Sequence, residues 1–152
     1  VMESGRIRQI GTPREVFQRP ASTFVANFIG ATPMNLIDAQ VVNGQLDLGG
    51  FALPVPDGFT VAEGDKIVYG LRPEYLRCTA NAPDSKDVVQ GTVAAVENLG
   101  VNVLVAVDVG EHSLRAVVPE ADEPELGSTV WLMPAPRRAL LYRGDDGELI
   151  GS

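Results

Sequence analysis

The spacing of apolar and polar residues predicts two short helices in the first 36 residues. Thr12 and Glu15 have the spacing of a capping box, with Pro13 in the first turn, so the first helix begins there. Pro20 ends this helix, because the residue before a proline avoids the helical region. A second helix begins near residue 21 or 22 and ends at Gly30.

Both predicted helices carry apolar side chains that need cover. The second helix has one apolar face, which we expect to pack on the rest of the chain, formed by Phe24, Val25, Phe28 and Ile29. The first helix has two large apolar residues, Val16 and Phe17. We expect these two to have lost their cover, since the chain reads as the end of a larger domain.

The first ten residues predict a hairpin that turns at Ser4 and Gly5. An isolated two-stranded hairpin is not stable in water, so it must belong to something larger. Because Val1 and Met2 already lie in a strand-like pattern, we expect the chain to begin inside a longer protein. Exposed apolar residues here would favour self-association.

After Pro33 the pattern changes to short strands separated by glycine-containing turns. Pro54 places one of these strands at a sheet edge. Strands are expected at residues 36–42, 45–48, 51–55, 66–71, 88–97, 101–109, 113–118, 129–133, 139–142 and 148–150. About nine or ten strands at this spacing predict a mainly β fold, as one small barrel or a pair of them.

Composition and charge limit the kinds of molecule and the cellular setting that suit this chain. A hydrophobic content of 45% in 152 residues indicates a globular chain, and no apolar run approaches the ~20 residues of a membrane helix. The single cysteine, Cys78, excludes an internal disulfide and favours a reducing, cytoplasmic setting. Residues 1–30 carry a net charge of +2 and residues 31–152 a net charge of −10. Such an acidic domain repels phosphate backbones, which makes nucleic acid a poor partner.

The sequence contains no pattern typical of an active site. A Walker A motif and a G-x-G-x-x-G motif are both absent. His112 is the only histidine and is predicted to be a surface turn residue, so a zinc site or a catalytic triad is hard to build. Acidic residues at 120–125 and 145–146 are better explained as solvated loops than as a cation site. We therefore expect no catalytic, cofactor-binding or metal-binding residues.

Two short segments are not explained by strand patterning. Arg72, Pro73 and Glu74 end a strand; Arg72 can bind a carboxylate or backbone carbonyls, and Glu74 can accept from main-chain donors. A corner held by an ion pair is favoured over a ligand site. The second segment, Glu97 to Gly100, joins two strands, and Gly100 is expected to have a positive φ angle.

Three motifs, in this order, carry a family resemblance. They are GRIRQIGTPREVFQRPASTFVANFIGATPMNL at residues 5–36, GLRPE at 70–74 and VENLG at 96–100. The chain closely resembles the C-terminal part of ATPase subunits from carbohydrate and glycerol-phosphate ABC importers, of the maltose-importer and UgpC type. The final LLYRGDDGELI also resembles the last hairpin of this family.

The resemblance implies a domain division and a set of partners. Residues 1–30 would be the C-terminal tail of a missing nucleotide-binding domain, and residues 31–152 a regulatory domain of OB-like TOBE β-barrel modules. ATP and Mg would bind in the missing domain, and this part would not be an enzyme. The parent would be a homodimer through its regulatory domains, bound to membrane permease subunits on the cytoplasmic face and open to a regulatory protein. The motif positions expected to make structural, dimer or regulatory contacts are Gly30, Met34, Asn35, Arg72, Pro73, Glu74, Glu97 and Gly100.

Three functions remain open at this point. The first is a non-catalytic regulatory and dimerisation domain of an importer ATPase. The second is a sensor of a small ligand, an oxyanion or a sugar, although the net charge of residues 31–152 disfavours an anion. The third, an oligonucleotide-binding OB module, needs a basic groove with stacking aromatic residues, and an acidic domain is poorly suited to provide it.

Overall fold

The computed structural model describes residues 1–151 and begins with the predicted hairpin. Strands β1 (Met2–Glu3) and β2 (Arg6–Ile7) pair with each other only. Helices α1 (Pro13–Gln18) and α2 (Thr23–Phe28) follow. The first begins at its predicted capping residue, Thr12, and the second begins at Ser22, which caps it, within the predicted start at residue 21 or 22. Thr12 and Glu15 form the reciprocal capping box that their spacing predicts.

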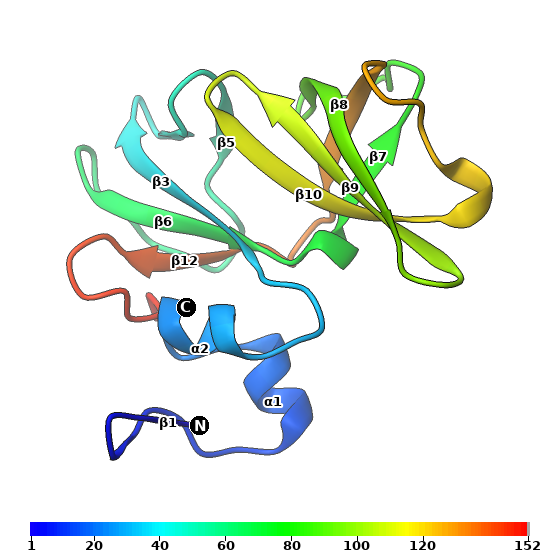
Figure 1. The fold of residues 1–152 in the computed structure, drawn as a ribbon. Coiled ribbons are helices and arrows are strands. Elements are labelled where there is room, and N and C mark those ends of the chain that lie inside the picture. Colours follow the sequence, from blue (N-terminus) through cyan, green and yellow to red (C-terminus); the bar gives the residue numbers. More distant parts are fainter. Residues whose placement is uncertain (152) are drawn as a thin grey trace.

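Ten strands then form two antiparallel five-stranded sheets (Figure 1). The first sheet has the order β12-β6-β3-β4-β5: β3 (Asn35–Val42), β4 (Gln45–Asp47), β5 (Ala52–Pro54), β6 (Lys66–Leu71) and β12 (Leu140–Arg143). The second has the order β10-β9-β8-β11-β7: β7 (Leu76–Thr79), β8 (Val89–Asn98), β9 (Asn102–Val109), β10 (His112–Pro119) and β11 (Thr129–Pro134). Short 3-10 helices η1 (Pro73–Tyr75) and η2 (Glu120–Asp122) follow β6 and β10.

The two sheets share one hydrophobic core and curve around it into a nearly closed, barrel-like fold. Alternate residues of each strand enter this core, for example Ile37 and Tyr69 from the first sheet and Val105 from the second. The opposite face of the first sheet is also covered. There α2 packs against a second, smaller cluster formed by Ala26, Met34, Leu140 and Tyr142. The first sheet therefore lies between the main core and the helices, which explains the nearly continuous apolar runs of β6 and β12.

The mainly β prediction is confirmed, with two errors in the strands. The segment expected at 148–150 is not a strand, since Glu148 and Leu149 make only isolated bridges, to Ser22 and Tyr142. Strand β7 lies outside the predicted set and contains Cys78. Pro54 does lie in an edge strand, since β5 ends the order of the first sheet.

Some predictions of exposure were wrong. Val16 is buried, and Phe17 is half-buried against Arg72, because the first helix packs on the barrel. Phe28 is 64% exposed, since it lies at the end of α2 and stacks on Phe24 at a ring distance of 5.9 Å. His112 is half-buried at the start of β10, with its ring edge-on to Phe51. Within residues 1–151, none of the helices has the length and apolar character to cross a membrane.

Candidate functional site

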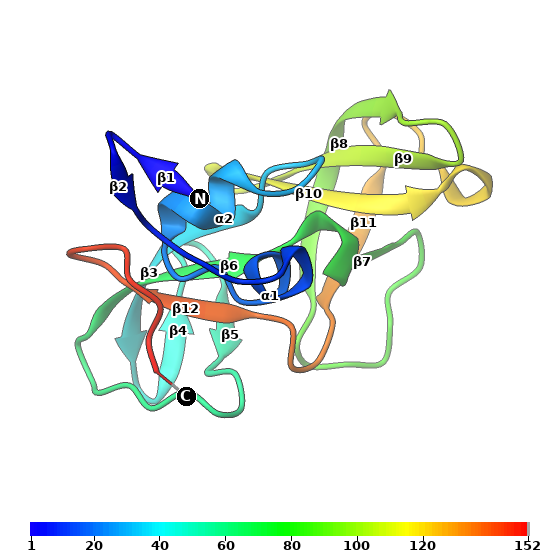
Figure 2. The same ribbon diagram turned by 90° about the horizontal axis from the view of Figure 1, so that it is seen from below.

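Arg72 lies at the centre of the region where the helices meet the barrel. It follows the last residue of β6 and precedes η1, and its side chain is only 2% exposed. We call this region the helix–barrel junction; it consists of α1, α2, residues 29–35 and residues 72–74. Figure 2 shows it from below, with α1 and α2 lying across the first sheet and η1.

The Arg72 guanidinium binds backbone carbonyls of both helices. Its Nε and Nη2 donate to the carbonyl of Phe17 in α1 at 3.2 and 3.0 Å. Its Nη1 donates to the carbonyl of Ile29, the C-terminal cap of α2, at 2.9 Å. The flat face of the guanidinium lies 4.0 Å from the centre of the Phe17 ring. One side chain thus holds the C-terminal ends of two helices.

This arrangement has a clear physical basis. The last carbonyls of a helix have no partner inside the helix, and they carry partial negative charge. Arginine offers a planar set of donors that matches two separated oxygens. In the described part of the chain no carboxylate lies within ion-pair distance of Arg72, so the predicted ion-paired corner was wrong and the backbone-carbonyl alternative is confirmed. Burial lowers the pKa of the Arg72 guanidinium, but arginine remains charged at neutral pH.

Gly30 and Glu74 lie next to Arg72. Gly30 has φ of +111°, and a Cβ there would stand 2.9 Å from Nη1 of Arg72. Any larger residue would be strained and would displace the guanidinium. Glu74 does not accept from the main chain as expected; its Oε1 accepts from the Thr32 hydroxyl at 2.9 Å. Pro73 is buried in η1. The connection from α2 to β3 therefore runs directly over the Arg72–Glu74 corner.

Tyr142 provides a second buried tie between helices and barrel. Its ring is fully buried in β12, and its hydroxyl donates to the carbonyl of Pro20, between the two helices, at 3.1 Å. Met34 packs in the same cluster. A Cβ on Gly70 would lie 2.9 Å from the Met34 sulfur and 3.0 Å from the Tyr142 ring, so the small residue allows both to pack there.

Asn35 connects the junction to the second sheet. Its Nδ2 donates to the Arg115 carbonyl at 2.8 Å, and its Oδ1 accepts from the Arg115 amide at 2.9 Å. Arg115 lies in the edge strand β10. The asparagine amide therefore pairs with β10 in the way a neighbouring strand would, and it occupies part of an open sheet edge.

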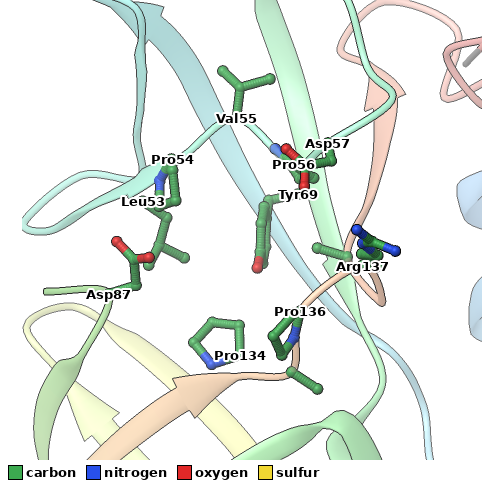
Figure 3. A pocket seen from close by; sticks show the side chains of 12 residues that line it. Leu53, Pro54, Val55, Pro56, Asp57, Tyr69, Asp87, Pro134, Pro136 and Arg137 are labelled. Carbon is green, nitrogen blue, oxygen red and sulfur yellow. The ribbon is translucent and has the colours of Figure 1, made fainter. Parts of the chain in front are cut away.

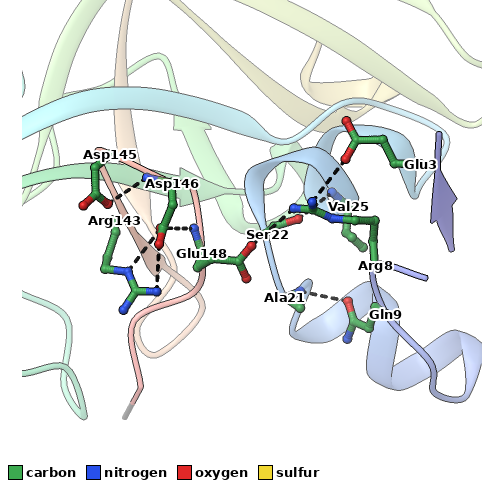
Figure 4. A network of polar contacts seen from close by, with 10 residues as sticks. All are labelled: Glu3, Arg8, Gln9, Ala21, Ser22, Val25, Arg143, Asp145, Asp146 and Glu148. Carbon is green, nitrogen blue, oxygen red and sulfur yellow. Dashed lines mark hydrogen bonds and ion pairs between the residues drawn. The ribbon is translucent and has the colours of Figure 1, made fainter. Parts of the chain in front are cut away.

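Both ends of the chain meet beside α2 (Figure 4). Arg8 forms ion pairs with Glu3 at 3.4 Å and with Glu148 at 3.2 Å. The Gln9 side chain accepts from the Ala21 amide at 2.8 Å. Residues 147–149 bond the backbone of residues 21–23. These surface ion pairs add little energy alone, yet they align the hairpin, the helices and the C-terminal segment.

The two remaining motif positions lie elsewhere. Glu97 is exposed at the end of β8, and Gly100 turns the chain into β9 with φ of +107°, as predicted. The Asn98 side chain accepts from the Gly100 amide at 2.7 Å and shapes this turn. Figures 1 and 2 both draw the β8–β9 turn at the right, to the side of the helices and clear of them. Six of the eight motif positions thus gather at the junction, and two do not.

The junction is built for mechanical connection. Arg72 has its donors on carbonyls and its face on Phe17, so little of it is left for an anion or a substrate. Among residues 1–151, no group of three His, Cys, Asp or Glu side chains is placed to hold a metal ion. Sequence reasoning missed Tyr142 as a contact, because a tyrosine in an apolar strand does not reveal that its hydroxyl meets a carbonyl 122 residues away.

Two family models match the chain. Residues 69–141 match the TOBE domain, and residues 35–77 match the CysA C-terminal regulatory domain. Together the two matches run from β3 to the start of β12 and include Arg72, Pro73 and Glu74. The overlap of the two, residues 69–77, contains the corner after β6.

Similar proteins agree with these matches. The chain is 37% identical to the sn-glycerol-3-phosphate import ATP-binding protein UgpC of Shigella sonnei (strain Ss046) and of Escherichia coli (strain K12). Each alignment covers 99% of this chain and 42% of the relative, so the chain spans less than half the length of these relatives. Among solved structures, the cytoplasmic molybdate-binding protein ModG, with molybdate bound, has a TM-score of 0.59. That similarity covers 70% of this chain and 94% of ModG at 16% identity, and it supports the fold alone.

Proposed function

We propose that this chain, whose residues 69–141 match the TOBE domain and residues 35–77 the CysA C-terminal regulatory domain, is the non-catalytic regulatory and dimerisation domain of an ABC importer's ATP-binding subunit. The imported solute would be sn-glycerol 3-phosphate or a sugar, in line with the named relatives and the sequence resemblance. ATP and Mg would bind in the nucleotide domain that precedes this part of the subunit.

One observation carries the regulatory role: Arg72 binds the ends of α1 and α2 at the same time. Any movement of the segment before residue 30 would pull on a buried charge at the end of β6. The barrel and the preceding domain would then move as one body. We therefore assign residues 1–30 to the tail of the nucleotide domain and residues 31–152 to the regulatory domain, with the junction as their fixed connection.

The partners follow from this assignment. Two subunits would associate through their regulatory domains, while the nucleotide domains would contact permease subunits at the cytoplasmic face of the membrane. A regulatory protein would dock on the exposed surface of the barrel. A small-ligand sensor remains the alternative, but the junction offers it no open cationic site, since Arg72 is committed to carbonyls.

The test uses the complete ATP-binding subunit and a version that ends at the residue equivalent to Gly30. Light scattering would measure the mass of each in solution, and a nucleotide-binding assay would measure ATP affinity. We expect the complete subunit to be a dimer. The shortened subunit should bind ATP but be a monomer without nucleotide. A complete subunit that stays monomeric at high concentration would contradict the dimerisation role, and loss of ATP binding on shortening would contradict the domain division.

A further inference from the structure

A groove of about 340 Å³ lies on the opposite side of the first sheet from the helices, between the ends of both sheets. One wall is β5 and the loop after it, and the other is the connection from β11 to β12 (Figure 3). Asp87, from the loop before β8, lies at its rim. The groove shares no residue with the helix–barrel junction, and neither the motifs nor the proposed function use it.

Tyr69 forms the floor of the groove. Its side chain comes from β6 and is only 4% exposed. Its hydroxyl makes no hydrogen bond to any residue between 1 and 151, although the aromatic ring that carries it is packed in the core. No fully buried polar side-chain atom among the described residues lacks a hydrogen-bond partner, so this unpartnered hydroxyl keeps some contact with solvent. Tyr69 lines the groove, so a ligand there can supply the partner that this hydroxyl lacks.

Three charged side chains share the groove with Tyr69. Asp57, Asp87 and Arg137 all line the groove, and in Figure 3 Asp87 and Asp57 lie on different sides of Tyr69. None of the three forms an ion pair with another described residue. Burial, with a contribution from Asp87, raises the pKa of Tyr69, so the phenol keeps its proton at neutral pH. The groove therefore carries two free carboxylates against one guanidinium.

The walls are rigid and apolar. Apolar residues provide most of the lining, and four of them are prolines: Pro54, Pro56, Pro134 and Pro136. Prolines fix the backbone, and their ring side chains offer only carbon atoms, which suits a hydrocarbon chain. The domain around the groove has a net charge of −10 in residues 31–152, so its field attracts cations and repels oxyanions.

We propose that this groove binds an aliphatic diamine. One ammonium would lie between the Tyr69 oxygen and the Asp87 carboxylate, and the alkyl chain would follow the proline walls. The second ammonium would approach Asp57. The phenolic oxygen accepts an N–H, and the carboxylates accept the others, so every charge of the ligand has a partner. Failure of this proposal would leave the regulatory role at the junction unaffected.

Calorimetric titration of the 152-residue chain would compare three probes of equal chain length: putrescine, n-butylamine and 1,4-butanediol. We expect putrescine to bind most tightly, butylamine at least about tenfold more weakly, and butanediol not at all, since each charged hydrogen bond is strong. Equal binding of butanediol and putrescine, or no binding of putrescine at millimolar concentration, would overturn the proposal. Binding of inorganic phosphate in preference to putrescine would overturn it as well.

Three variants locate the site. Tyr69→Phe should weaken putrescine binding about threefold to tenfold, and Asp87→Asn at least about tenfold. Without ligand, Tyr69→Phe should leave the melting temperature unchanged, because the hydroxyl has no described partner to lose. Asp122→Asn is the matched control: it removes the same charge in η2, outside the groove. Equal weakening by Asp122→Asn and Asp87→Asn would show diffuse attraction instead of a site, as would full affinity in Tyr69→Phe.

Discussion

Arg72 shows how a charged residue can be buried without a charged partner. Its cost of desolvation is offset by three hydrogen bonds to two carbonyls and by the aromatic ring beneath it. Lysine has the same charge but a single compact head group, so it cannot reach both carbonyls in one plane. The guanidinium geometry, more than the charge, is what the junction requires.

Replacing Arg72 should therefore be costly. Arg72→Met leaves the Phe17 and Ile29 carbonyls without partners and should lower the free energy of unfolding by about 2–4 kcal/mol. Arg72→Lys should lower it by about 1–2 kcal/mol, since part of the bonding survives. Urea denaturation would measure both. Arg77→Met removes the same charge from an exposed position of β7 and should change stability by less than about 0.5 kcal/mol. An equal loss in Arg72→Met and Arg77→Met would contradict the role of the carbonyl contacts.

The buried tyrosines should make the fold sensitive to alkali. Burial raises the pKa of Tyr69 and Tyr142 above the usual 10.0 in the folded chain, while the unfolded chain releases these protons near pH 10. The stabilisation is complete below pH 10 and is lost as the pH rises further, by about 1.4 kcal/mol per pH unit for each tyrosine. Urea denaturation at several pH values from 9 to 11 would measure the slope. Tyr142→Phe should reduce that slope; an unchanged slope would contradict the assignment, because other titrating groups are common to both proteins.

At the residue scale, the sequence predicted what a side chain can bind better than it predicted which groups it does bind. Arg72 was recognised as able to bind carbonyls, and Gly100 as needing a positive φ, because both follow from the residue and its local pattern. The carbonyls that Arg72 binds lie 43 and 55 residues away, and local pattern has no information on such pairs. The groove around Tyr69 could not be predicted for the same reason, since its walls come from four separate segments of the chain.

At the scale of elements, the two helices depend on the barrel. Each has six residues, and isolated helices shorter than ~12–15 residues are marginal in water. Capping by Thr12 and Ser22 fixes where they begin. Their persistence comes from burial of Val16, Val25 and Ala26 and from the contacts of Arg72 and Tyr142. The helices are therefore best regarded as part of the barrel's outer layer.

Asn35 should be essential for joining β3 to the edge of β10. In Asn35→Asp the carboxylate can still accept from the Arg115 amide, but it faces the Arg115 carbonyl with no proton to donate. We expect a loss of about 1–2 kcal/mol and faster hydrogen exchange at the Arg115 amide. The matched control is Gln40→Glu, on the exposed face of the same strand, whose amide makes one bond at 3.3 Å to Gly64. Unchanged exchange at Arg115 would show that the asparagine is dispensable at this edge.

The strands were predicted well where one face is buried and the other exposed. β3 alternates in burial along its length, and its predicted and observed bounds differ by one residue. The apolar–polar alternation did not predict pairing correctly in two segments, β7 and residues 148–150. β7 is short and carries arginine and cysteine, and residues 148–150 read as a strand but make only bridges beside α2. In both places pairing is decided by neighbours in space.

At the scale of the whole molecule, the hairpin is the least covered part. Met2, Ile7 and Ile10 are 59%, 63% and 82% exposed, while the barrel keeps most of its large apolar residues inside. The mainly β fold followed from the sequence, but the cover of Val16 and Phe17 did not, because it depends on how the helices lie on the first sheet. We therefore expect the exposed hairpin to associate copies of this chain, in addition to the proposed dimer contact of the regulatory domain.

A triple substitution can separate these two surfaces. Met2→Ser, Ile7→Ser and Ile10→Ser together should not reduce stability by more than about 1 kcal/mol, because all three side chains are exposed. If residues 31–152 form the dimer, the triple variant should remain a dimer by light scattering and lose only larger, concentration-dependent species, since their apolar contacts are removed. A variant that becomes monomeric at every concentration would place the association in the hairpin and would contradict dimerisation through the barrel. Leu126→Ser, in an exposed loop before β11, is the control for removing one large apolar side chain from the barrel surface.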